Sequence, residues 1–360
     1  MTVKITKPEI NVREKLAELD KPSGVAGEAM LRAETPRQQQ ELIGAGRKNL
    51  ILNGDFRVSQ RGTYTSATAT THNQLYLDRW VVRLTNVTAN IQHILGTNSA
   101  PGYPYKGSNS LRLTATSSAT GMMRHLQRVE GFLSGKTLTV SAWVKSNSPN
   151  ARVFSYQHNG GYRESSQPHS GNGEWEYLTL TTVNDANSAN QLYFDIALAS
   201  ETFGTTTITS GEYVEISEVQ MEVGKVATPF ECRSYGEELA LCQRYYQKLF
   251  DTNIGTFRHR WQGRIGSIYS TTRVFVTVDL PVQMRTTPTL VFDTGGNGFR
   301  WNIYSANADI GPSTAISTTY PSRDSIGFDV FPMANLPSGY VGFACHMDVR
   351  DGWCHASAEM

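Results

Sequence analysis

The chain has 360 residues, enough for two or three domains at roughly 100 to 200 residues each, and its 33 Lys and Arg balance 32 Asp and Glu for a net charge of +1. A basic face for nucleic acid and an apolar run of about 18 residues for membrane insertion are both missing, which excludes these two classes of protein. The 31 Gly, 14 Pro, 16 Tyr and 14 Phe are typical of antiparallel strands joined by tight turns. The composition therefore predicts a mainly β protein.

Residues 1–48 differ from the rest of the chain, because nine are Lys or Arg, seven are Asp or Glu and none is aromatic. Such a segment cannot build its own core, although Pro8 and Thr35 favour the start of two short helices. We expect these helices to dock on another protein or on symmetry copies of the chain, and the alternative is a solvated, partly disordered tail. The candidate docking positions are the regularly spaced apolar residues Val12, Leu16, Leu19, Leu42 and Ile43. The amino terminus lacks the pattern of a secretory signal, so we expect folding in the cytoplasm.

Residues 49–232 contain short segments with alternating or β-branched and aromatic residues, which predict the strands of a β-sandwich. The eight expected strands are 50–56, 79–84, 110–114, 138–145, 151–157, 176–182, 191–197 and 213–222. The tryptophans of this region, Trp80, Trp143 and Trp175, lie in strand-like contexts and are assigned to core packing.

A connecting helix is predicted over residues 233–250, because Ser234 and Glu237 have the spacing of a capping box. Its expected buried face carries Leu239, Cys242, Tyr246 and Leu249. Residues 251–360 are predicted to form a second, smaller β domain for trimerisation or receptor contact. Its expected strands are 265–269, 273–278, 289–293, 299–304, 325–331 and 340–348.

Polar loops of the first β domain offer a route to binding. Tyrosines in or beside them present ring faces near Asn, Gln and Arg donors, an arrangement that can stack on a sugar and bond its hydroxyls; the alternative is that they are ordinary surface residues. The candidate carbohydrate-binding residues are Tyr103, Tyr105, Tyr156 and Tyr162. No nucleophile elbow, phosphate-binding loop or zinc-protease motif is present, so the sequence predicts no enzyme and no catalytic residue. Glycoside hydrolysis, which needs only two suitably separated carboxylates, stays open as an alternative.

Acidic residues at both ends of the first β domain suggest a metal site. If the segment holding Asp55 pairs with the strand holding Glu218, their carboxylates and nearby carbonyls can hold Ca²⁺, which prefers oxygen ligands. The alternative is that both are solvated and the protein has no cofactor. The four cysteines all lie after residue 231 and are interpreted as buried thiols. The alternative is a metal site or a disulfide, for which Cys345, His346, Cys354 and His355 form a cluster in the sequence.

Three stretches, NLILNGDF (49–56), LTVSAWVK (138–145) and EISEVQMEVG (215–224), together resemble the edges of galactose-binding-like jelly-roll carbohydrate-binding modules. With the helix sequence 235–248 and PVQMRTTP (281–288), the chain resembles tail fibres and related virion proteins of tailed bacteriophages. Residues 31–44 are similar to the virion-attachment segments of such proteins.

The resemblance implies a jelly roll over 49–232 and a homotrimer in the virion, docked on other virion proteins through residues 1–48 and binding host-surface polysaccharide or glycan. Modules of this type often carry Ca²⁺ between the first and last strands, at the place of Asp55 and Glu218, although the pattern here is Ser-Glu-Val rather than two aspartates. Besides a tail fibre, a head-surface fibre or decoration protein stays open. A depolymerase spike is disfavoured, since no internal repeat is visible.

Overall fold

The computed structural model describes residues 48–96, 109–130, 133–157, 163–184, 192–199, 204–251, 264–293, 301–305, 308–309, 313–332, 344–349 and 353–359. The predicted docking residues of the amino-terminal segment, Val12, Leu16, Leu19, Leu42 and Ile43, lie outside these ranges. No helix within the described ranges has the length and apolar character needed to cross a membrane. By their contacts, residues 51–360 form one unit of the chain, which is separate from residues 1–50.

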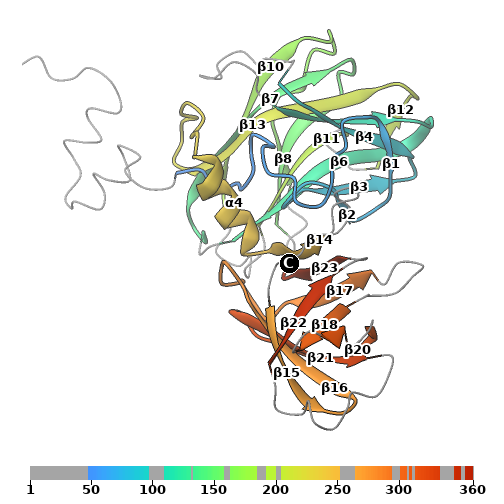
Figure 1. Cartoon of the computed structure of the whole chain (residues 1–360). Coiled ribbons are helices and arrows are strands. Elements are labelled where there is room, and N and C mark those ends of the chain that lie inside the picture. Colours follow the sequence, from blue (N-terminus) through green and yellow to red (C-terminus); the bar gives the residue numbers. More distant parts are fainter. Residues whose placement is uncertain are drawn as a thin grey trace, which may run out of the picture. The chain divides into compact units, whose positions relative to one another are not determined.

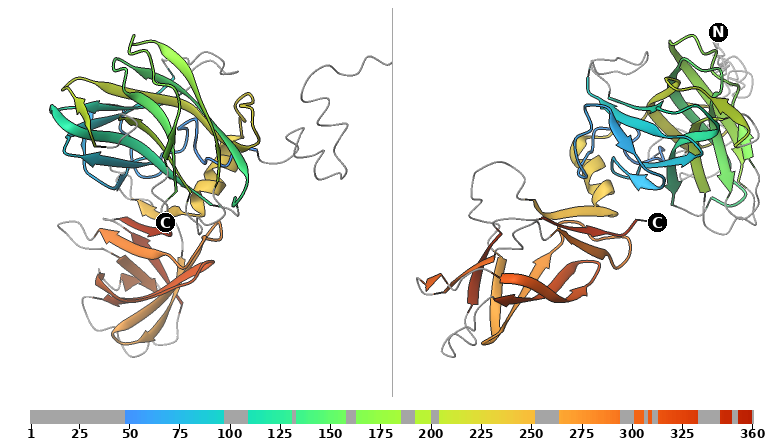
Figure 2. Two further views of the ribbon diagram at one scale, coloured as in Figure 1. Left: turned by 180° about the vertical axis from the view of Figure 1, so that it is seen from behind. Right: turned by 90° about the vertical axis from the view of Figure 1, so that its right-hand side faces the viewer.

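Strands β1–β13 form a sandwich of two antiparallel sheets, called here the first sandwich (Figure 1). One sheet has the order β1 (Thr68–Thr70), β4 (Ala89–Ile94), β5 (Ser110–Ala115), β13 (Tyr213–Val223), β7 (Thr137–Ser146) and β10 (Trp175–Val183). The other has the order β2 (Gln74–Leu75), β3 (Val81–Thr85), β6 (Ala119–Val129), β11 (Leu192–Leu198), β8 (Ala151–Gln157) and β9 (Arg163–Ser165), with β12 (Thr206–Ile208) beside β6. Figure 2 shows the two layers from two further sides. The predicted β-sandwich is confirmed.

The core of the first sandwich lies between the two sheets and follows strand alternation. In β7, Leu138, Val140, Ala142 and Val144 are all fully buried and point to the core, so the residues between them belong to the outer face of the sheet. Trp80, which precedes β3, is also buried, as predicted. The first expected strand, 50–56, is instead a loop with bends and a turn, because Asn53 and Phe56 both have positive φ.

Helix α4 (Tyr235–Gln243) begins as predicted at Ser234, whose side chain accepts a hydrogen bond from the backbone N–H of Glu237 at 3.2 Å. It ends at Gln243 rather than near Phe250, because the chain enters strand β14 (Tyr246–Asp251), which pairs with β23 (Trp353–Ser357). The buried residues of the helix are Glu238, Leu241 and Cys242. The expected buried face is therefore only partly correct.

Strands β14–β23 form the second sandwich, again entirely from antiparallel pairs among the strands described. A three-stranded sheet has the order β14, β23 and β17 (Thr289–Asp293). A seven-stranded sheet has the order β19 (Ala308–Asp309), β18 (Trp301–Ser305), β22 (Ala344–Val349), β15 (Arg264–Ser270), β16 (Arg273–Asp279), β21 (Ser325–Pro332) and β20 (Ser313–Pro321). The core between them contains the inward residues of β16 and the buried thiol of Cys354.

Charged and aromatic side chains join the end of the chain to the first sandwich. Glu359 pairs with Arg61 at 2.9 Å and also with Arg79. The two guanidinium groups lie over aromatic rings, Arg61 at 3.8 Å from the centroid of Tyr246 and Arg79 at 3.7 Å from that of Tyr245. These contacts hold β14 and the residues after β23 against the loops before β3.

Candidate functional site

The structure leaves the predicted carbohydrate-binding tyrosines untested. Tyr103, Tyr105 and Tyr162 lie outside the described residues, and Tyr156 lies on β8 at a position whose side chain is likewise not described. The candidate site therefore has to be built from other residues of the first sandwich. Two regions stand out: the junction between the loop 51–58 and β13, and the outer face of β7 and β10.

The loop 51–58 is shaped by Asn53. This side chain donates to the carbonyl of Val58 at 2.8 Å and accepts from the N–H of Val58 at 2.9 Å, which closes the loop on itself. The carbonyl of Asn53 accepts from the indole N–H of Trp80 at 2.9 Å. Since Asn53 itself has positive φ, the residue type allows this turn, and Asp55 is carried at a fixed place within it.

A β-bulge in β13 faces this loop. The register of β13 with β7 shifts between Ser217 and Gln220, and Glu218 has a φ of 50°. The N–H of Val219 donates to the carbonyl of Gly54 at 2.9 Å. A Cβ on Gly54 would lie 2.2 Å from the carbonyl oxygen of Val219, so only glycine permits this approach. The bulge and the loop thus hold Asp55 and Glu218 at one junction.

Both carboxylates at the junction are buried, which contradicts the alternative that they are solvated. Oδ1 of Asp55 and Oε1 of Glu218 are buried without a hydrogen-bond partner. Burial, and secondarily the charge of Asp55, raises the pKa of Glu218 to about 8. Two buried carboxylate oxygens without hydrogen-bond partners fit one part of a Ca²⁺ shell. The described residues contain no group of three or more metal-ligating side chains, so backbone carbonyls or water would complete that shell.

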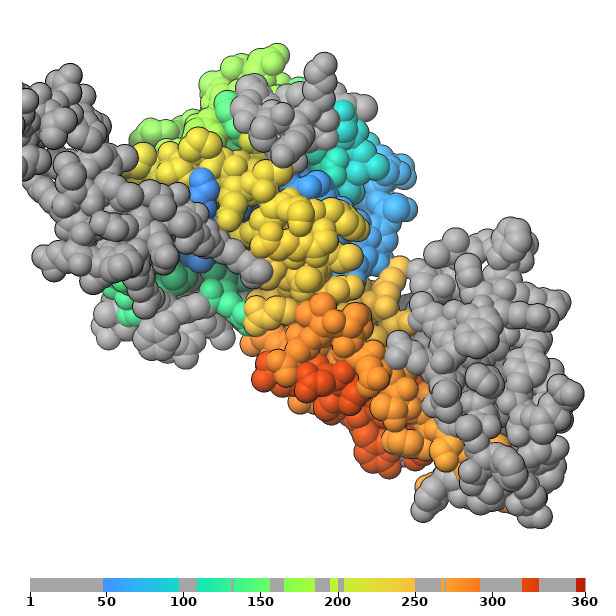
Figure 3. Space-filling view, turned by 60° about the vertical axis from the view of Figure 1, so that its left-hand side comes forward, coloured from blue at the N-terminus to red at the C-terminus, as the bar shows by residue number. Residues whose placement is uncertain are grey.

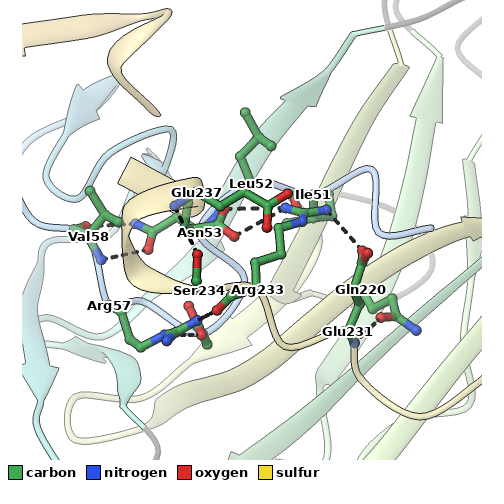
Figure 4. A network of polar contacts seen from close by, with 12 residues as sticks. Ile51, Leu52, Asn53, Arg57, Val58, Gln220, Glu231, Arg233, Ser234 and Glu237 are labelled. Atoms are coloured by element: carbon green, nitrogen blue, oxygen red, sulfur yellow. Dashed lines mark hydrogen bonds and ion pairs between the residues drawn. The ribbon is translucent and has the colours of Figure 1, made fainter. Parts of the chain in front are cut away.

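Arginines surround the same junction in a network of polar contacts (Figure 4). Arg57 pairs with the other oxygen of Asp55 and donates to the carbonyl of Arg233 at 2.5 Å. Arg233 pairs with Glu231 and with Glu238 of α4, both at 3.2 Å. Glu238 in turn accepts from the N–H of Asn53 at 2.5 Å. The network fastens the loop to the helix, and it gives the junction a structural role.

The segment that follows β13 lies against the outer face of that strand, next to the loop 51–58. These two segments together are called the cover of β13. The backbone N–H of Glu231 donates to the side chain of Gln220 at 2.8 Å, and the N–H of Thr228 donates to Glu222 at 2.8 Å. In the space-filling view of Figure 3, small blue areas of the loop after residue 50 lie between yellow atoms, the colour of β13 and of the residues that follow it. The outer face of β13 is therefore closed at this end.

The neighbouring strands β7 and β10 have a more open outer face. Trp143 lies opposite Tyr177, and their ring centroids are 5.1 Å apart with an angle of 50° between the planes. Tyr177 is 41% exposed, and Trp143 is half-buried. Trp143 was assigned to the core from the sequence; it lies on the opposite face because Ala142 and Val144 on either side of it point inward. Trp175 is also half-buried and pairs with Lys145 of β7.

Polar groups flank the Trp143–Tyr177 pair. Thr179 is exposed two residues after Tyr177 on the same face of β10, and Lys145 lies two residues after Trp143 on β7. Burial raises the pKa of Tyr177, a hydrogen bond with Ser141 opposes this, and Glu222 and Glu218 add to the rise. The phenol thus stays protonated at neutral pH and can act as a hydrogen-bond donor. The carboxyl group of Glu218 in the bulge is therefore close enough to Tyr177 to affect the pKa of its phenol.

An ion pair joins β13 to β5, which lies on the other side of β13 from β7 in the same sheet. Arg112 of β5 donates through Nε at 2.8 Å and through a terminal nitrogen at 2.5 Å to one oxygen of Glu215 on β13, and Ser110 donates to the other oxygen. The guanidinium lies 4.5 Å from the ring centroid of Tyr213. Because every polar oxygen of Glu215 is occupied, this group holds the sheet surface in shape and leaves ligand contacts to the aromatic face.

No family model matches the chain, and no curated protein matches it. Among solved structures, it is similar to the enzymatically active domain of tailspike protein 4 of bacteriophage CBA120 (12% identity, TM-score 0.31), with 49% of this chain and 21% of that chain covered. It is also similar to TmCBM61 in complex with β-1,4-galactotriose (13% identity, TM-score 0.31), with 49% and 99% covered. A xylan-binding domain of carbohydrate-binding module family 22 matches at 14% identity and a TM-score of 0.29, with 47% and 99% covered. Each of these likenesses covers about half of this chain.

Proposed function

We propose that this chain is a non-enzymatic subunit of a bacteriophage virion fibre, and that the first sandwich binds glycans of the host surface. The observation that carries the proposal is the Trp143–Tyr177 pair, which lies on the open outer face of β7 and β10 beside Lys145 and Thr179. A sugar ring has an apolar face that packs on aromatic side chains and a rim of hydroxyls that needs hydrogen-bond partners. This strand face offers both.

A shallow site of this kind binds weakly by itself. The proposed assembly is a homotrimer attached to other virion proteins through residues 1–48, so several such sites act together on one particle. Linking sites raises overall affinity by about 10² to 10⁴ without new contacts, provided that they can bind simultaneously. A weak site on each copy is therefore sufficient for adhesion. Native mass spectrometry of the full chain tests the trimer, and a monomer would contradict it.

The glycan site is tested with the full chain displayed multivalently on an oligosaccharide array. We expect Tyr177→Ala to lower binding about tenfold or more, which corresponds to about 1.4 kcal/mol per site. Tyr235→Ala is the matched control, because Tyr235 is also exposed (53%) but lies at the start of α4. Equal binding by both variants would contradict the proposed site. Release of reducing sugar ends from host polysaccharide would contradict the non-enzymatic role.

Attachment through residues 1–48 is tested in the full chain by replacing Leu16 and Leu19 with Glu. We expect the variant to fold but to be missing from assembled particles. Normal incorporation would contradict the docking role. Labelling of the incorporated protein on the particle separates a tail fibre from a head-surface fibre.

A structural Ca²⁺ between Asp55 and Glu218 is the second part of the proposal. Its support is the pair of orphaned buried oxygens, and the ion would stabilise the loop–bulge junction without taking part in any reaction. After treatment with EDTA, added Ca²⁺ should raise the Tm of the full chain, by an amount equivalent to about 2.7 kcal/mol at 100 times the Kd. Asp55→Asn should abolish this rise, while Asp324→Asn at an exposed position should not. An unchanged Tm with Ca²⁺ would remove the ion from the proposal.

A further inference from the structure

The seven-stranded sheet of the second sandwich has a hollow on its outer face that the function proposed above does not use. Its volume is about 460 Å³, which lies within the range of about 300 to 1,000 Å³ usual for small-molecule sites. Four neighbouring strands contribute to it. The lining residues among those described are Ser267, Arg273, Phe275, Tyr320 and Asp329.

Strand pairing brings these side chains to one face. In β16, Val274, Val276 and Val278 point into the core, so Arg273 and Phe275 point outward. Phe275 pairs with Ser267 of β15 on one side and with Asp329 of β21 on the other. The hollow thus has a rigid floor made of paired strands, and flexible loops are not needed to form it.

The aromatic wall of the hollow depends on a glycine. Gly327 of β21 pairs with Tyr320 of β20, and a Cβ on Gly327 would lie 2.8 Å from the tip of the Phe275 ring. The missing side chain lets the Phe275 ring lie low over β21, next to the Tyr320 side chain. The two ring centroids are 6.1 Å apart at an angle of 58°. With Tyr320 55% exposed and Phe275 36% exposed, both rings present apolar surface to a ligand.

The charged residues around the hollow limit the classes of ligand that it can bind. Arg273 and Asp329 contribute one positive and one negative group, so an anion such as a phosphate gains from the first and is opposed by the second. A protein partner would need about 800 Å² of contact on its side, which is far more than this small hollow provides. Two rings, a hydroxyl and a balanced pair of charged hydrogen-bonding groups suit a neutral ligand with an apolar face and a polar rim. A pyranose ring has this chemistry.

We propose that the hollow formed by Phe275, Tyr320, Arg273 and Asp329 is a second glycan-binding site, which takes one neutral sugar ring against its aromatic wall. This inference rests on the proposed function only in that the chain binds glycans; the site itself is separate from the Trp143–Tyr177 face. Each copy of the chain then has two sites on two sandwiches. A trimer would carry six, which strengthens multivalent adhesion.

The test uses the full chain and four probes: maltotriose, cellotriose, xylotriose and β-1,4-galactotriose, each immobilised for affinity chromatography, with trigalacturonate as an acidic contrast. Wild type is compared with Tyr177→Ala, Tyr320→Ala and the double variant; Tyr235→Ala is again the matched control. We expect Tyr320→Ala to reduce binding of at least one neutral probe about tenfold. The binding that remains in Tyr177→Ala should disappear in the double variant. Trigalacturonate should be retained no better than the neutral probes.

The outcomes separate the two sites. If Tyr177→Ala abolishes all binding and Tyr320→Ala changes none, the second site is overturned and the proposed function stands. If Tyr320→Ala abolishes all binding and Tyr177→Ala changes none, the face on the first sandwich is overturned and the hollow stands. Gly327→Ala provides a second variant, because it displaces the Phe275 ring without removing either aromatic side chain; it should weaken the same probe as Tyr320→Ala. Unchanged binding by both variants overturns the hollow.

Discussion

Strands β13 and β16 are interior strands of one sheet in each sandwich, yet their outer faces differ. Both alternate apolar and polar residues in sequence, and both point their apolar residues into a core. In β16 every second residue is exposed, whereas in β13 nine consecutive residues are buried. At its bulge β13 meets the loop 51–58, its Gln220 and Glu222 bond to the segment after the strand, and Glu215 and Ser217 bond to residues 109–112. Alternation therefore reports which face meets the core, but it does not report whether the other face meets water.

The polar residues have different roles on the two strands. On β13 they are structural: Gln220, Glu222 and Glu215 each bond to neighbouring segments. On β16 and its neighbours they surround an open hollow, where ligands have access. The two ligand surfaces that we propose both lie where the cover is missing, on β7 and β10 in one sandwich and on β16 and its neighbours in the other.

Replacing Arg233, the cation that pairs with Glu231 and with Glu238 of α4, should have the largest effect on the unfolding free energy. Arg233→Met leaves Glu238 buried without its ion-pair partner, and breaking a buried pair in this way costs about 3–5 kcal/mol of unfolding free energy. Arg244→Met is the control, since Arg244 is 42% exposed and lies 3.6 Å from Glu130; its loss should cost less than about 1 kcal/mol. Urea denaturation followed by tryptophan fluorescence measures both. Equal midpoints would mean that the cover adds nothing to the stability of the first sandwich.

The close approach of the loop to the bulge gives the next effect. Gly54→Ala places a Cβ against the backbone of Val219, and because backbone atoms cannot swing away, we expect a loss of about 1–3 kcal/mol. Gly236→Ala in α4 is the matched control, as nothing lies within 4 Å of its Cβ position; it should be neutral or stabilise by up to about 1 kcal/mol. A neutral Gly54→Ala in urea denaturation would show that the junction is loose.

Much of the strand pattern was predictable, but the junction was predictable only in part. The expected strand 213–222 is close to β13, because its alternation is local. The loop at 50–56 was predicted as a strand, since its cover depends on contacts such as that of Asn53 with Glu238, 185 residues away. A site at Asp55 and Glu218 was suggested by the acidic residues at both ends of the domain, on the condition that the two segments pair, and by the family resemblance; periodicity did not indicate it. A sequence pattern within ten residues cannot predict contacts between residues that are so far apart in the chain.

The positions of Trp143 and Tyr320 on the outer faces could likewise not be predicted from local sequence patterns. Trp143 stands in the apolar run Ala142-Trp143-Val144, in which the sequence does not reveal which residues point inward. Tyr320 lies on β20, a strand that was not predicted at all. Only the pairing of Gly327 with Tyr320, and the place of Phe275 above that glycine, bring the residues of the hollow together. The signal that was available, an exposed aromatic beside a glycine in a paired strand, requires the register to be known.

The buried imidazole of His125, near the backbone of Val214 in β13, gives a prediction for the pH dependence of the unfolding free energy. Burial lowers the pKa of His125 on β6 to about 3, with a smaller opposing effect from the backbone of Val214. The unfolded chain, with a pKa near 6.5, then binds more protons, so stability is full above about pH 6.5 and falls towards pH 3. The slope approaches about 1.4 kcal/mol per pH unit. His125→Leu should flatten this part of the stability curve and His72→Gln at the surface should not; parallel curves for wild type and His125→Leu would contradict the burial argument.

The smallest effect compares the two strands directly. Ser217 of β13 is fully buried and donates to the carbonyl of Asn109 at 2.8 Å, so Ser217→Ala leaves that acceptor without its partner and should cost about 1–2 kcal/mol. Thr277 has the outward position on β16, where it is exposed, and Thr277→Ala should change the unfolding free energy by about 0.5 kcal/mol or less. Both replacements delete a hydroxyl from the outer face of a central strand. Thr277→Ala also deletes a methyl group, but from a solvent-exposed position, so equal losses in urea denaturation would mean that water reaches Ser217 on β13 as it reaches Thr277 on β16.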